Sequence, residues 1–413
     1  MPTRVVVTGI GLVTCLGSGV ASNWEALEAG RSGIGPITLF DTTRFATRIA
    51  GEVHGNFDPQ GFIPEKELRR LDRFQQFALV AAAEAMKDSG LECPPANPFR
   101  YGIVVGSGMG GLGTIETGLD VFRIKGPKGT HPLMIPKVVA NLAPGLLSIK
   151  YGFKGPNFAL VNACTSGASA IGEAFMMIRS GRADAIITGG TEAVVTEFSV
   201  SCFNALRALS TRNGDPERAS RPFDKDRDGF VIAEGAGIML LESLEHATKR
   251  GARIYGEVIG YGATGDAYHV VMPDPEGEGA YQAMKMALED AHLAPAKIDY
   301  INAHGTGTEL NDVMETRAIK KLFGKAAYSV SISGTKSMTG HMIGAAGAVE
   351  AIYCLLAMAK SVIPPTINLD NPYPECDLNY TPLHAARRKV EYALTNSFAF
   401  GGQNASLVFR RLD

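Results

Sequence analysis

Residues 161–175 read VNACTSGASAIGEAF: an apolar approach, one cysteine, and then a run of the smallest side chains. The stretch that begins at Gly167 resembles GAAGAVEAI at residues 344–352, with a constant offset of 177 residues. The same offset pairs Cys164 with His341, so each would stand at the start of a helix of small residues. The similarity indicates an internal duplication.

Such a duplication would divide the chain near residue 255. We predict two related halves, residues 1–255 with the cysteine and residues 256–413 with the histidine. Because no low-complexity segment or long linker separates them, they should pack as one body. The alternative is chance, since any two buried helices rich in alanine and glycine look alike.

Elsewhere, short β-rich runs alternate with segments of helical period. The β-rich runs are RVVVTGI (4–10), YGIVVGS (101–107), ADAIITGG (183–190), GIMLLES (237–243), YINAHG (300–305) and ALTNSFAF (393–400). The helical segments are RFQQFALVAAAEAMKDSG (73–90), GAYQAMKMALEDAH (279–292) and METRAIKKLFG (314–324). Strands separated by helices predict a layered α/β fold.

The composition excludes several classes of partner and site. Lys and Arg number 40 against 42 Asp and Glu, so no global field favours nucleic acid or an anionic membrane surface. The six cysteines are far apart and form no C-x-x-C pair, which fits neither a zinc ribbon nor a secreted disulfide framework. We therefore expect a cytoplasmic protein, or one from an organelle stroma or matrix.

The first twenty residues, MPTRVVVTGIGLVTCLGSGV, superficially imitate a secretory signal peptide. Thr8, Gly9, Gly11 and Thr14 interrupt the apolar stretch too early, and VVVTGIG is more typical of a buried strand that enters a turn. No later window approaches the roughly 20 uninterrupted apolar residues of a membrane helix. We expect a soluble N-terminus and no membrane partner.

Two motifs imitate ligand sites without completing them. Gly106, Gly108 and Gly111 reproduce the dinucleotide pattern G-x-G-x-x-G, but about 20 residues later a basic stretch replaces the acidic residue that binds ribose. We interpret this motif as a tight glycine turn beside a cavity. DKDRDGFVIAEG (224–235) begins like a calcium loop, but its twelfth position is Gly235 instead of glutamate, and we expect no metal there.

Cys164 is a candidate nucleophile. A thiolate is the reactive form of cysteine, and a helix N-terminus lowers a thiol pKa because its free N–H groups and its dipole favour negative charge. Small neighbours such as Ala163 and Ser166 would let other backbone approach, as a buried acyl-transfer site requires. A lone buried cysteine is more often a small core residue, so other motifs must decide.

Two histidine motifs favour catalysis. YINAHGTGTELND places His304 at the end of a strand, and SGTKSMTGHMIGAAG places Lys336 and His341 five residues apart. Histidines on glycine-rich loops point into cavities more often than histidines on apolar helix faces. Two neutral imidazoles and a cationic lysine suit a reaction whose intermediate carries negative charge on oxygen. Acyl transfer to Cys164, followed by capture of a carbanion, fits this set.

Two other classes stay open at this point. Zinc could bind Cys164, His304 and His341, although structural zinc sites usually contain close pairs of ligands and these residues are isolated. A papain-like hydrolase would also use one cysteine and one histidine, but it would need neither a second histidine nor a lysine.

Several motifs together carry a resemblance to a known family. They are NACTSG, NAHGTGT, KSMTGH with GAAGAVE, RALSTRNGDPERASRPFDKDRDGFVIAEGAG, PPTINLDNP and the ending NSFAFGGQNASLVF. In this order they resemble the elongating β-ketoacyl-acyl-carrier-protein synthases of the thiolase-like superfamily, most closely the ketoacyl synthase II group, over essentially the whole chain. The resemblance implies a thiolase-like α/β fold of duplicated halves in a five-layer αβαβα sandwich, and a homodimer.

The resemblance also implies roles for the site residues. Cys164 would accept the acyl chain, while His304 and His341 would hold the malonyl thioester and stabilise its enolate. Lys336 would orient His341, and the backbone N–H groups of Cys164 and Phe400 would form the oxyanion hole. The further residues implied are Glu350 beside the histidine network, Thr306 and Thr308 on the phosphopantetheine arm, and Met109, Ala399, Phe400 and Gly401 at the acyl tunnel and its gate.

The implied reaction is a decarboxylative Claisen condensation in fatty acid elongation. A fatty acyl chain passes from acyl carrier protein to the cysteine, and malonyl-acyl carrier protein then loses carbon dioxide. The carbanion attacks the acyl thioester and gives a 3-oxoacyl chain two carbons longer. No cofactor of the enzyme takes part, because the substrates arrive on the phosphopantetheine arm of the carrier. The alternatives are a polyketide ketosynthase and a carrier-binding scaffold without catalysis.

Acidic carrier proteins need a basic docking patch even on a neutral enzyme. Lys66, Arg69 and Arg70 in FIPEKELRRLDRF are three and four residues apart on one expected helical face and match the family's docking segment, and Arg207 could extend the patch. Without the resemblance, a solvated helix face would be the ordinary interpretation.

The gate loop departs from the family pattern. Where the family commonly has G-F-G-G followed by Thr or His and then Asn, this chain has Ala399-Phe400-Gly401-Gly402-Gln403-Asn404. Alanine disfavours the positive φ values that glycine adopts, so Ala399 should stiffen the loop that moves Phe400. A flexible thioether at Met109 would adapt the pocket to chain length. These positions leave the preferred acyl length open. Whether the chain binds a monovalent cation is also open.

Overall fold

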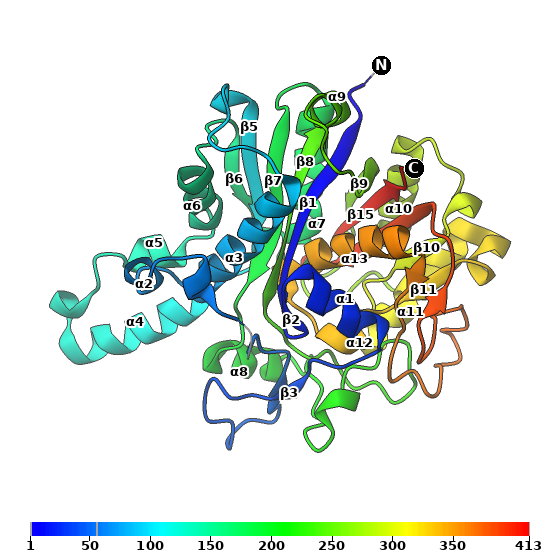
Figure 1. Cartoon of the computed structure of the whole chain (residues 1–413). Helices are drawn as coiled ribbons and strands as arrows, with labels where there is room; N and C mark the ends of the chain where they lie inside the picture. The colour runs from blue at the N-terminus through cyan, green and yellow to red at the C-terminus, as the bar shows by residue number, and fades with distance from the viewer. Residues whose placement is uncertain (1, 55–56, 413) are drawn as a thin grey trace.

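A computed structural model describes residues 2–54 and 57–412, and one mixed β-sheet runs through it (Figure 1). Its hydrogen-bonded order is β6-β5-β7-β8-β1-β9-β15-β14-β10-β11, with the short β2 paired to β1. The strands of the first half are β1 (Val5–Thr14), β2 (Gly17–Ser18), β5 (Tyr101–Gly106), β6 (Asn157–Leu160), β7 (Ala185–Glu192) and β8 (Gly235–Ser243). Those of the second half are β9 (Gly256–Gly265), β10 (Tyr300–Asn302), β11 (Ser331–Ser333), β14 (Tyr392–Phe398) and β15 (Gln403–Arg410).

The two halves of the sheet have the same topology. The order β6-β5-β7-β8-β1 in the first half matches β11-β10-β14-β15-β9 in the second. In each half three strands are parallel and the two nearest the centre are antiparallel. The halves meet where β1 pairs antiparallel with β9, with Val5 opposite Val258. The duplication is therefore confirmed, whereas the exact division at residue 255 stays a prediction.

Helices complete five layers, as the resemblance implied. The middle layer consists of α7 (Ser166–Arg179) and α13 (Ala346–Lys360), which pack between the two halves of the sheet (Figure 1). The outer layers are α3 (Arg73–Ser89) with α6 (Leu142–Tyr151) on the first half and α10 (Glu278–Asp290) with α11 (Glu309–Phe323) on the second. The apolar side chains form separate clusters on either side of each half-sheet.

The predicted outer helices are present with adjusted ends. A capping box between Asp72 and Gln75 starts α3, and Gly90 in the left-handed conformation ends it. The helix α11 begins five residues before the predicted start at Met314, with Glu309 and Asp312 in its first turn. Acidic side chains stabilise the first turn of a helix, which explains why this polar segment is helical.

The middle helices explain the run of small residues. A Cβ atom added to Gly167 would lie 3.0 Å from the Cβ of Ala348, and one added to Gly347 would lie 2.9 Å from the Cβ of Ala168. Larger side chains at these four positions would force the two helices apart. The contact is reciprocal, as expected for two copies of one unit related by a twofold axis.

The reciprocal contact also corrects the predicted register. Gly167 is equivalent to Gly347, and the short turns Ala163–Thr165 and Ile343–Ala345 that precede the two helices are equivalent to each other. The structural offset is thus 180 residues, and the sequence match at 177 is three residues out. The counterpart of Cys164 is therefore Gly344, and His341 lies just before the equivalent turn.

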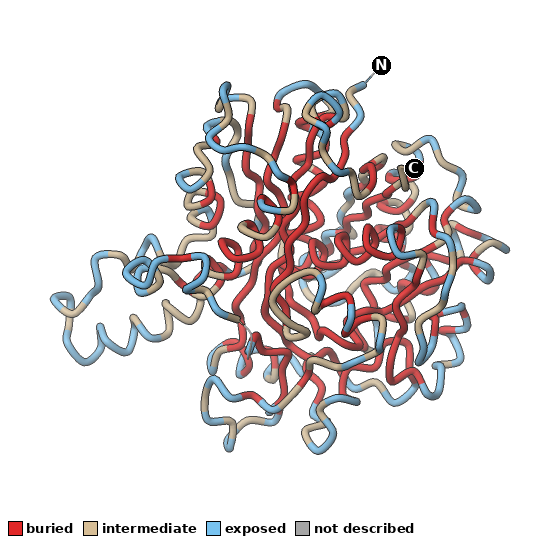
Figure 2. The backbone as a smooth tube through the Cα atoms, in the orientation of Figure 1, coloured by how far each residue is buried: buried red, intermediate tan, exposed pale blue. Residues whose placement is uncertain are grey.

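Burial follows these layers (Figure 2). All ten residues of β1 are buried, so the N-terminal stretch is a central strand, longer than predicted. Among the described residues, Ile343–Lys360 is the one helical segment long and apolar enough to cross a membrane, but 89% of it is buried inside the protein. Its composition reflects its place in the middle layer.

The remaining elements are short or peripheral. They are α1 (Val20–Glu28), α2 (Glu65–Leu68), α4 (Leu112–Lys125), α5 (Met134–Val138), α8 (Glu197–Ala205), α9 (Leu244–Lys249), α12 (Lys336–Thr339), β3 (Gly35–Pro36), β4 (Ile49–Ala50), β12 (Val362–Ile363) and β13 (Ala386–Arg387). The helix α4 projects from the first half, and none of its residues is buried (Figure 1).

Candidate active site

Cys164 lies in a tight turn between β6 and α7. Ala163 has φ of 45°, an unusual value for a residue with a side chain, and it turns the chain sharply ahead of the helix. Cys164 as a whole residue is 7% exposed. The sequence placed the cysteine at a helix N-terminus, and it indeed lies within the turn that leads into α7.

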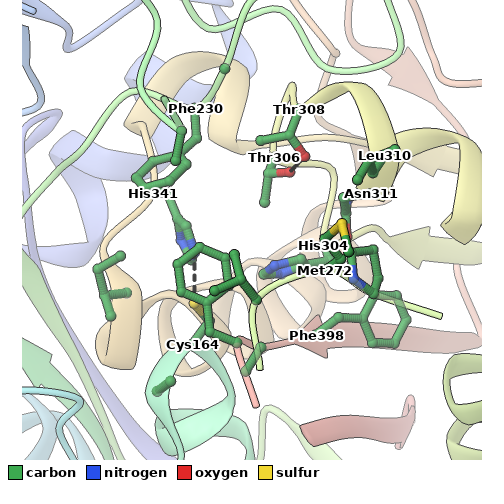
Figure 3. A pocket seen from close by; sticks show the side chains of 18 of the residues that line it. Cys164, Phe230, Met272, His304, Thr306, Thr308, Leu310, Asn311, His341 and Phe398 are labelled. Atoms are coloured by element: carbon green, nitrogen blue, oxygen red, sulfur yellow. Dashed lines mark hydrogen bonds between the residues drawn. The ribbon is translucent and has the colours of Figure 1, made fainter. Parts of the chain in front are cut away.

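Both predicted histidines face this thiol. Sγ of Cys164 lies 3.1 Å from Nε2 of His341, and the ring of His304 lies 5.3 Å from the ring of His341, nearly perpendicular to it. Figure 3 shows the three side chains around one space, with Thr306 and Thr308 across it. The cysteine comes from the first half and both histidines from the second, so the layered fold is what brings them together.

Backbone hydrogen bonds hold each histidine in place. The N–H of His341 donates to the carbonyl of Val231 over 2.7 Å, and the carbonyl of His341 accepts from Ala233 over 2.9 Å. The N–H groups of His304 and Gly305 each donate to the buried carboxylate of Glu315 over 2.9 Å. Both rings therefore project from fixed backbone.

Lys336 supports His304 instead of His341. Its ammonium group donates to the carbonyl of His304, lies 3.3 Å from Nδ1 of the same residue, and forms an ion pair of 2.5 Å with Glu350. The expectation that Lys336 orients His341 is thus corrected. Lys336 is 1% and Glu350 2% exposed, so each charge is balanced mainly by the other.

Burial sets the electrostatics of the site. It holds the pKa of His304 and of His341 well below the usual 6.5, with the charge of Lys336 acting in the same direction, so both rings are neutral at pH 7. Burial also raises the pKa of Cys164 to about 12, although the charge of Lys336 and the N–H of Phe400 oppose this. The helix end was expected to favour a thiolate, but the loss of water outweighs it.

A cavity of about 410 Å³ opens onto Cys164, His304 and His341. Aromatic rings pack against both imidazoles: Phe230 lies 5.3 Å from His341, and Phe398 lies 5.7 Å from His304. The predicted site residues that line the cavity are Cys164, His304, His341, Thr306, Thr308, Met109, Arg207, Ala399 and Phe400. Lys336 and Glu350 lie behind His304, outside this lining.

The gate loop joins β14 to β15. Gly401 and Gly402 have φ of 86° and 73°, values that glycine adopts freely, whereas Ala399 is not among the residues with positive φ. Alanine is therefore unstrained at position 399 in this conformation, and the predicted conflict with positive φ does not arise. The N–H of Gly401 donates to the carbonyl of Val270, which ties the loop to the segment after β9.

The predicted docking segment is only partly helical. The helix α2 ends at Leu68, so Arg69 and Arg70 lie beyond it and do not share a helical face with Lys66. Arg69 also forms an exposed ion pair of 2.9 Å with Glu65. All three basic side chains remain on the surface, and their role in docking stays a prediction.

The two imitated motifs have other roles. Gly106 ends β5 and Gly108 lines the cavity, in agreement with a glycine turn beside a cavity. In the calcium-like stretch, Asp224 forms an ion pair with Arg221 and accepts the backbone N–H groups of Asp226 and Asn371. The zinc alternative is also disfavoured, because a lysine cation beside one of its three proposed ligands would repel a divalent ion.

Sequence reasoning missed two buried carboxylates. Glu315 holds the backbone of His304, and Asn396 donates to it over 3.2 Å. Glu192, at the end of β7, binds the loop that carries Met109. The available signals were an acidic residue directly after a buried strand, and one on the inward face of the helix that follows the first histidine motif.

The chain is similar to known proteins along its whole length. The family model for the β-ketoacyl synthase N-terminal domain matches residues 2–247, and the one for the C-terminal domain matches residues 255–370. Two proteins named 3-oxoacyl-(acyl-carrier-protein) synthase 2 are among its relatives. The one from Coxiella burnetii is 51% identical, covering 99% of each chain, and the one from Synechocystis is 50% identical, covering 99% of this chain and 98% of the other.

Solved structures agree with the fold. A ketosynthase structure described as a type II PKS acyl-carrier protein in complex with its ketosynthase superposes with a TM-score of 0.93 at 35% identity, and a β-ketoacyl synthase from Burkholderia phymatum gives 0.92 at 35% identity. The first match covers all of both chains, and so does the second. With the cysteine and the two histidines of these motifs around one cavity and the lysine behind His304, the chain belongs to the β-ketoacyl synthase family.

Proposed function

We propose that this protein catalyses the decarboxylative condensation of malonyl-acyl carrier protein with a fatty acyl chain on Cys164, giving 3-oxoacyl-acyl carrier protein in fatty acid elongation. The names of relatives that are about half identical over the full length support this reaction. The observation that carries the proposal is the 3.1 Å contact between Sγ of Cys164 and Nε2 of His341 beside a second neutral imidazole.

Acyl transfer is the first step. The thiol proton moves to Nε2 of His341, and Sγ attacks the thioester carbon of the incoming acyl carrier protein. The bond from that carbon to the phosphopantetheine sulfur then breaks. His341 passes the proton to this sulfur, and the phosphopantetheine arm leaves as a free thiol. Because burial raises the thiol pKa to about 12, proton transfer must accompany the attack.

Decarboxylation is the second step. The bond between the malonyl carboxylate and its α-carbon breaks, carbon dioxide leaves, and the electron pair passes into an enolate. Neutral His304 can donate a hydrogen bond from Nε2 to that enolate oxygen, and neutral His341 can do so in the tautomer that carries its proton on Nε2. The enolate carbon then attacks the acyl thioester, Sγ of Cys164 leaves, and the thiolate takes up a proton from solvent to restore the thiol.

The oxyanion of this last step needs its own donors. The backbone N–H groups of Cys164 and Phe400 are proposed for this role, and the N–H of Phe400 is already one of the groups that lower the thiol pKa. The phosphopantetheine arm of the carrier must also be held in the cavity. The hydroxyls of Thr306 and Thr308, 2.9 Å apart on the cavity wall, offer hydrogen bonds to it. We propose that the enzyme uses no cofactor of its own.

We propose that acyl carrier protein docks near Lys66, Arg69 and Arg70, with Arg207 at the cavity mouth. Arg207 is exposed and lines the cavity, which supports its role beside an arriving phosphopantetheine. The carrier partner of the superposed ketosynthase supports this class of partner.

We propose a homodimer as well. The projecting helix α4 carries exposed Leu119, Phe122 and Ile124, the last of which is 82% exposed, and Ile135 nearby is 67% exposed. The strand β6 lies at one edge of the sheet, where a second copy could cover it. A cytoplasmic location follows from the proposed pathway and the free cysteines.

The decisive experiment separates condensation from hydrolysis. Purified enzyme is incubated with acyl carrier proteins of graded chain length and its intact mass is measured, and release of carbon dioxide from malonyl-acyl carrier protein is followed separately. We expect one acyl group on the wild type, none on Cys164→Ala, and carbon dioxide from both. A hydrolase has no reason to decarboxylate, so an acylated enzyme that never releases carbon dioxide would overturn the proposal.

A further inference from the structure

The two halves contain two equivalent helix starts, but only one holds a nucleophile. The turn before α7 carries Cys164, and the equivalent turn before α13 carries Gly344. Each turn contains one residue with positive φ at the same place, Ala163 at 45° and Ile343 at 44°. The first backbone N–H groups of each helix have no partner within the helix itself.

The second helix start is filled by a carboxylate of the chain itself. Oε2 of Glu192 accepts the N–H of Gly344 over 3.0 Å and that of Gly108 over 2.6 Å. Oε1 accepts the N–H of Met109 and the hydroxyl of Ser107, both over 3.2 Å. Glu192 is fully buried, so these four donors take the place of water.

The number of donors determines the chemistry of this side chain. A carboxylate has about four acceptor positions and no donor, and here each oxygen accepts two bonds. A glutamine would turn an N–H₂ group toward two donors, and a protonated acid would turn an O–H toward at least one. The charged form accepts all four of these bonds.

These bonds join two walls of the catalytic cavity. Gly108, Met109 and Ile343 line the cavity that contains Cys164, and Glu192 binds the backbone of the first two and the N–H that follows the third. The walls are in close contact, because a Cβ atom added to Gly108 would lie 3.0 Å from Cγ2 of Ile343. The relative position of the loop and the turn thus depends on this one carboxylate.

We propose that Glu192 is a positioning residue that fixes the inner wall of the acyl pocket, and so the discrimination between acyl chain lengths. The argument rests on the proposed function, because it requires an acyl chain on Cys164. The carboxylate touches no reacting group, so its loss should change which chains are accepted more than the chemistry itself.

The test compares Glu192→Gln with Glu84→Gln. Glu84 also accepts two backbone N–H groups, those of Leu12 and Val20, but lies on α3 away from the cavity. Acylation of Cys164 is timed by intact mass with a graded series of acyl chains, and malonyl decarboxylation is measured in parallel. In a fixed apolar pocket a single methylene changes the rate by about tenfold or more. We expect Glu192→Gln to reduce the ratio of the acylation rates for the best and the poorest chain by about tenfold. Glu84→Gln should leave this ratio unchanged.

The outcomes distinguish this proposal from the proposed function. Wild-type enzyme without acylation or decarboxylation would refute the proposed function. Glu192→Gln with normal decarboxylation and an unchanged length profile would refute the positioning role. If Glu192→Gln does not fold, Ser107→Ala removes one of the four donors and keeps the charge. An unchanged length profile there, with the same melting temperature as the wild type, would count against the proposal, and an altered one would support it.

Discussion

Nζ of Lys336 lies 3.3 Å from Nδ1 of His304, and this contact determines where the imidazole carries its proton. An ammonium group only donates, so Nδ1 must accept and the ring proton must sit on Nε2. His304 is therefore prepared to donate a hydrogen bond into the cavity. His341 has no such contact with Lys336, and its Nε2 faces the thiol instead.

Removal of Lys336 should affect both activity and stability. Lys336→Met frees Nδ1 of His304, and we expect malonyl decarboxylation to fall by about a hundredfold, as for other lost electrostatic contacts. It also leaves Glu350 buried without its partner, which should lower the free energy of unfolding by about 3 kcal/mol. The double variant Lys336→Met with Glu350→Gln should recover stability but not decarboxylation. Recovery of both would contradict the role of the lysine.

The neutral histidines predict a pH dependence of stability. The pKa of His304 and of His341 lies well below 6.5 in the folded chain because burial and Lys336 oppose the charge. Below pH 6.5 the unfolded chain binds protons that the folded chain does not. As the pH falls below 6.5, the free energy of unfolding should therefore decrease by about 1.4 kcal/mol per pH unit for each ring. Above pH 6.5 the neutral rings cause no such loss.

Three buried carboxyls change the stability in the opposite direction as the pH falls. The contribution of one histidine must therefore be isolated by comparing the wild type with a variant. Burial raises the pKa of Glu192, Glu315 and Glu350 to about 7, and the folded chain therefore gains stability from their protonation as the pH falls from 7 toward 4.5. Urea unfolding of wild type and His341→Ala at pH 7, 6 and 5 isolates one ring. The variant should lose less stability below pH 6.5, and parallel curves would refute the assignment.

The high pKa of Cys164 predicts slow alkylation at neutral pH. With a pKa of about 12, the thiolate fraction should rise about tenfold per unit between pH 7 and 9. The rate of iodoacetamide addition, measured by intact mass with Cys164→Ala as the control for other thiols, should follow this rise. A rate that reaches a plateau below pH 8 would show that the helix end prevails over burial.

Charge reversal tests the docking segment. Lys66→Glu with Arg70→Glu should raise the KM for acyl carrier protein by about tenfold at low salt, and the difference should shrink as salt screens the charges. Lys297→Glu, an exposed lysine of the second half, is the matched control. An equal effect of the control variant, or an effect that salt leaves unchanged, would place the carrier elsewhere.

The gate loop offers a test of flexibility. Since Ala399 does not have positive φ, Ala399→Gly should leave the fold unchanged and lower stability by about 0.4 to 1 kcal/mol through the unfolded chain. If Phe400 moves to open the tunnel, as the resemblance implies, a more mobile loop should speed acylation by long chains a few-fold. Single-turnover acylation with short and long chains measures this effect. Equal rates for the wild type and Ala399→Gly would exclude a gating role for position 399.

The sequence predicted the five layers and the grouping of Cys164, His304 and His341 at one cavity because each depends on local patterns. Small residues after Cys164 and in the first turn of α13 mark helices in close contact, and the first histidine motif stands at a strand end. The register failed by three residues because small side chains recur at several helical positions, so a one-dimensional match slides easily. The helix predicted around Lys66 ends earlier than expected, at Leu68, because charge alone does not determine where a helix ends.

Other features could not be predicted because they depend on distant parts of the chain. The pKa of Cys164 depends on how completely the halves exclude water, and the helix end is only one contribution. Glu192 and Glu315 each bind backbone N–H groups from other segments, so their importance is visible only after folding. The contact of Lys336 with His304 likewise joins residues 32 positions apart.

The nucleophile belongs to one repeat of the fold and both imidazoles to the other. A fragment cut between β8 and β9 would hold either the sulfur or the proton carriers, never both, however well it folded. In a single-repeat ancestor, chemistry of this kind would have required two copies to meet face to face. In the present chain the two equivalent corners differ, one carrying the cysteine and the other a glycine.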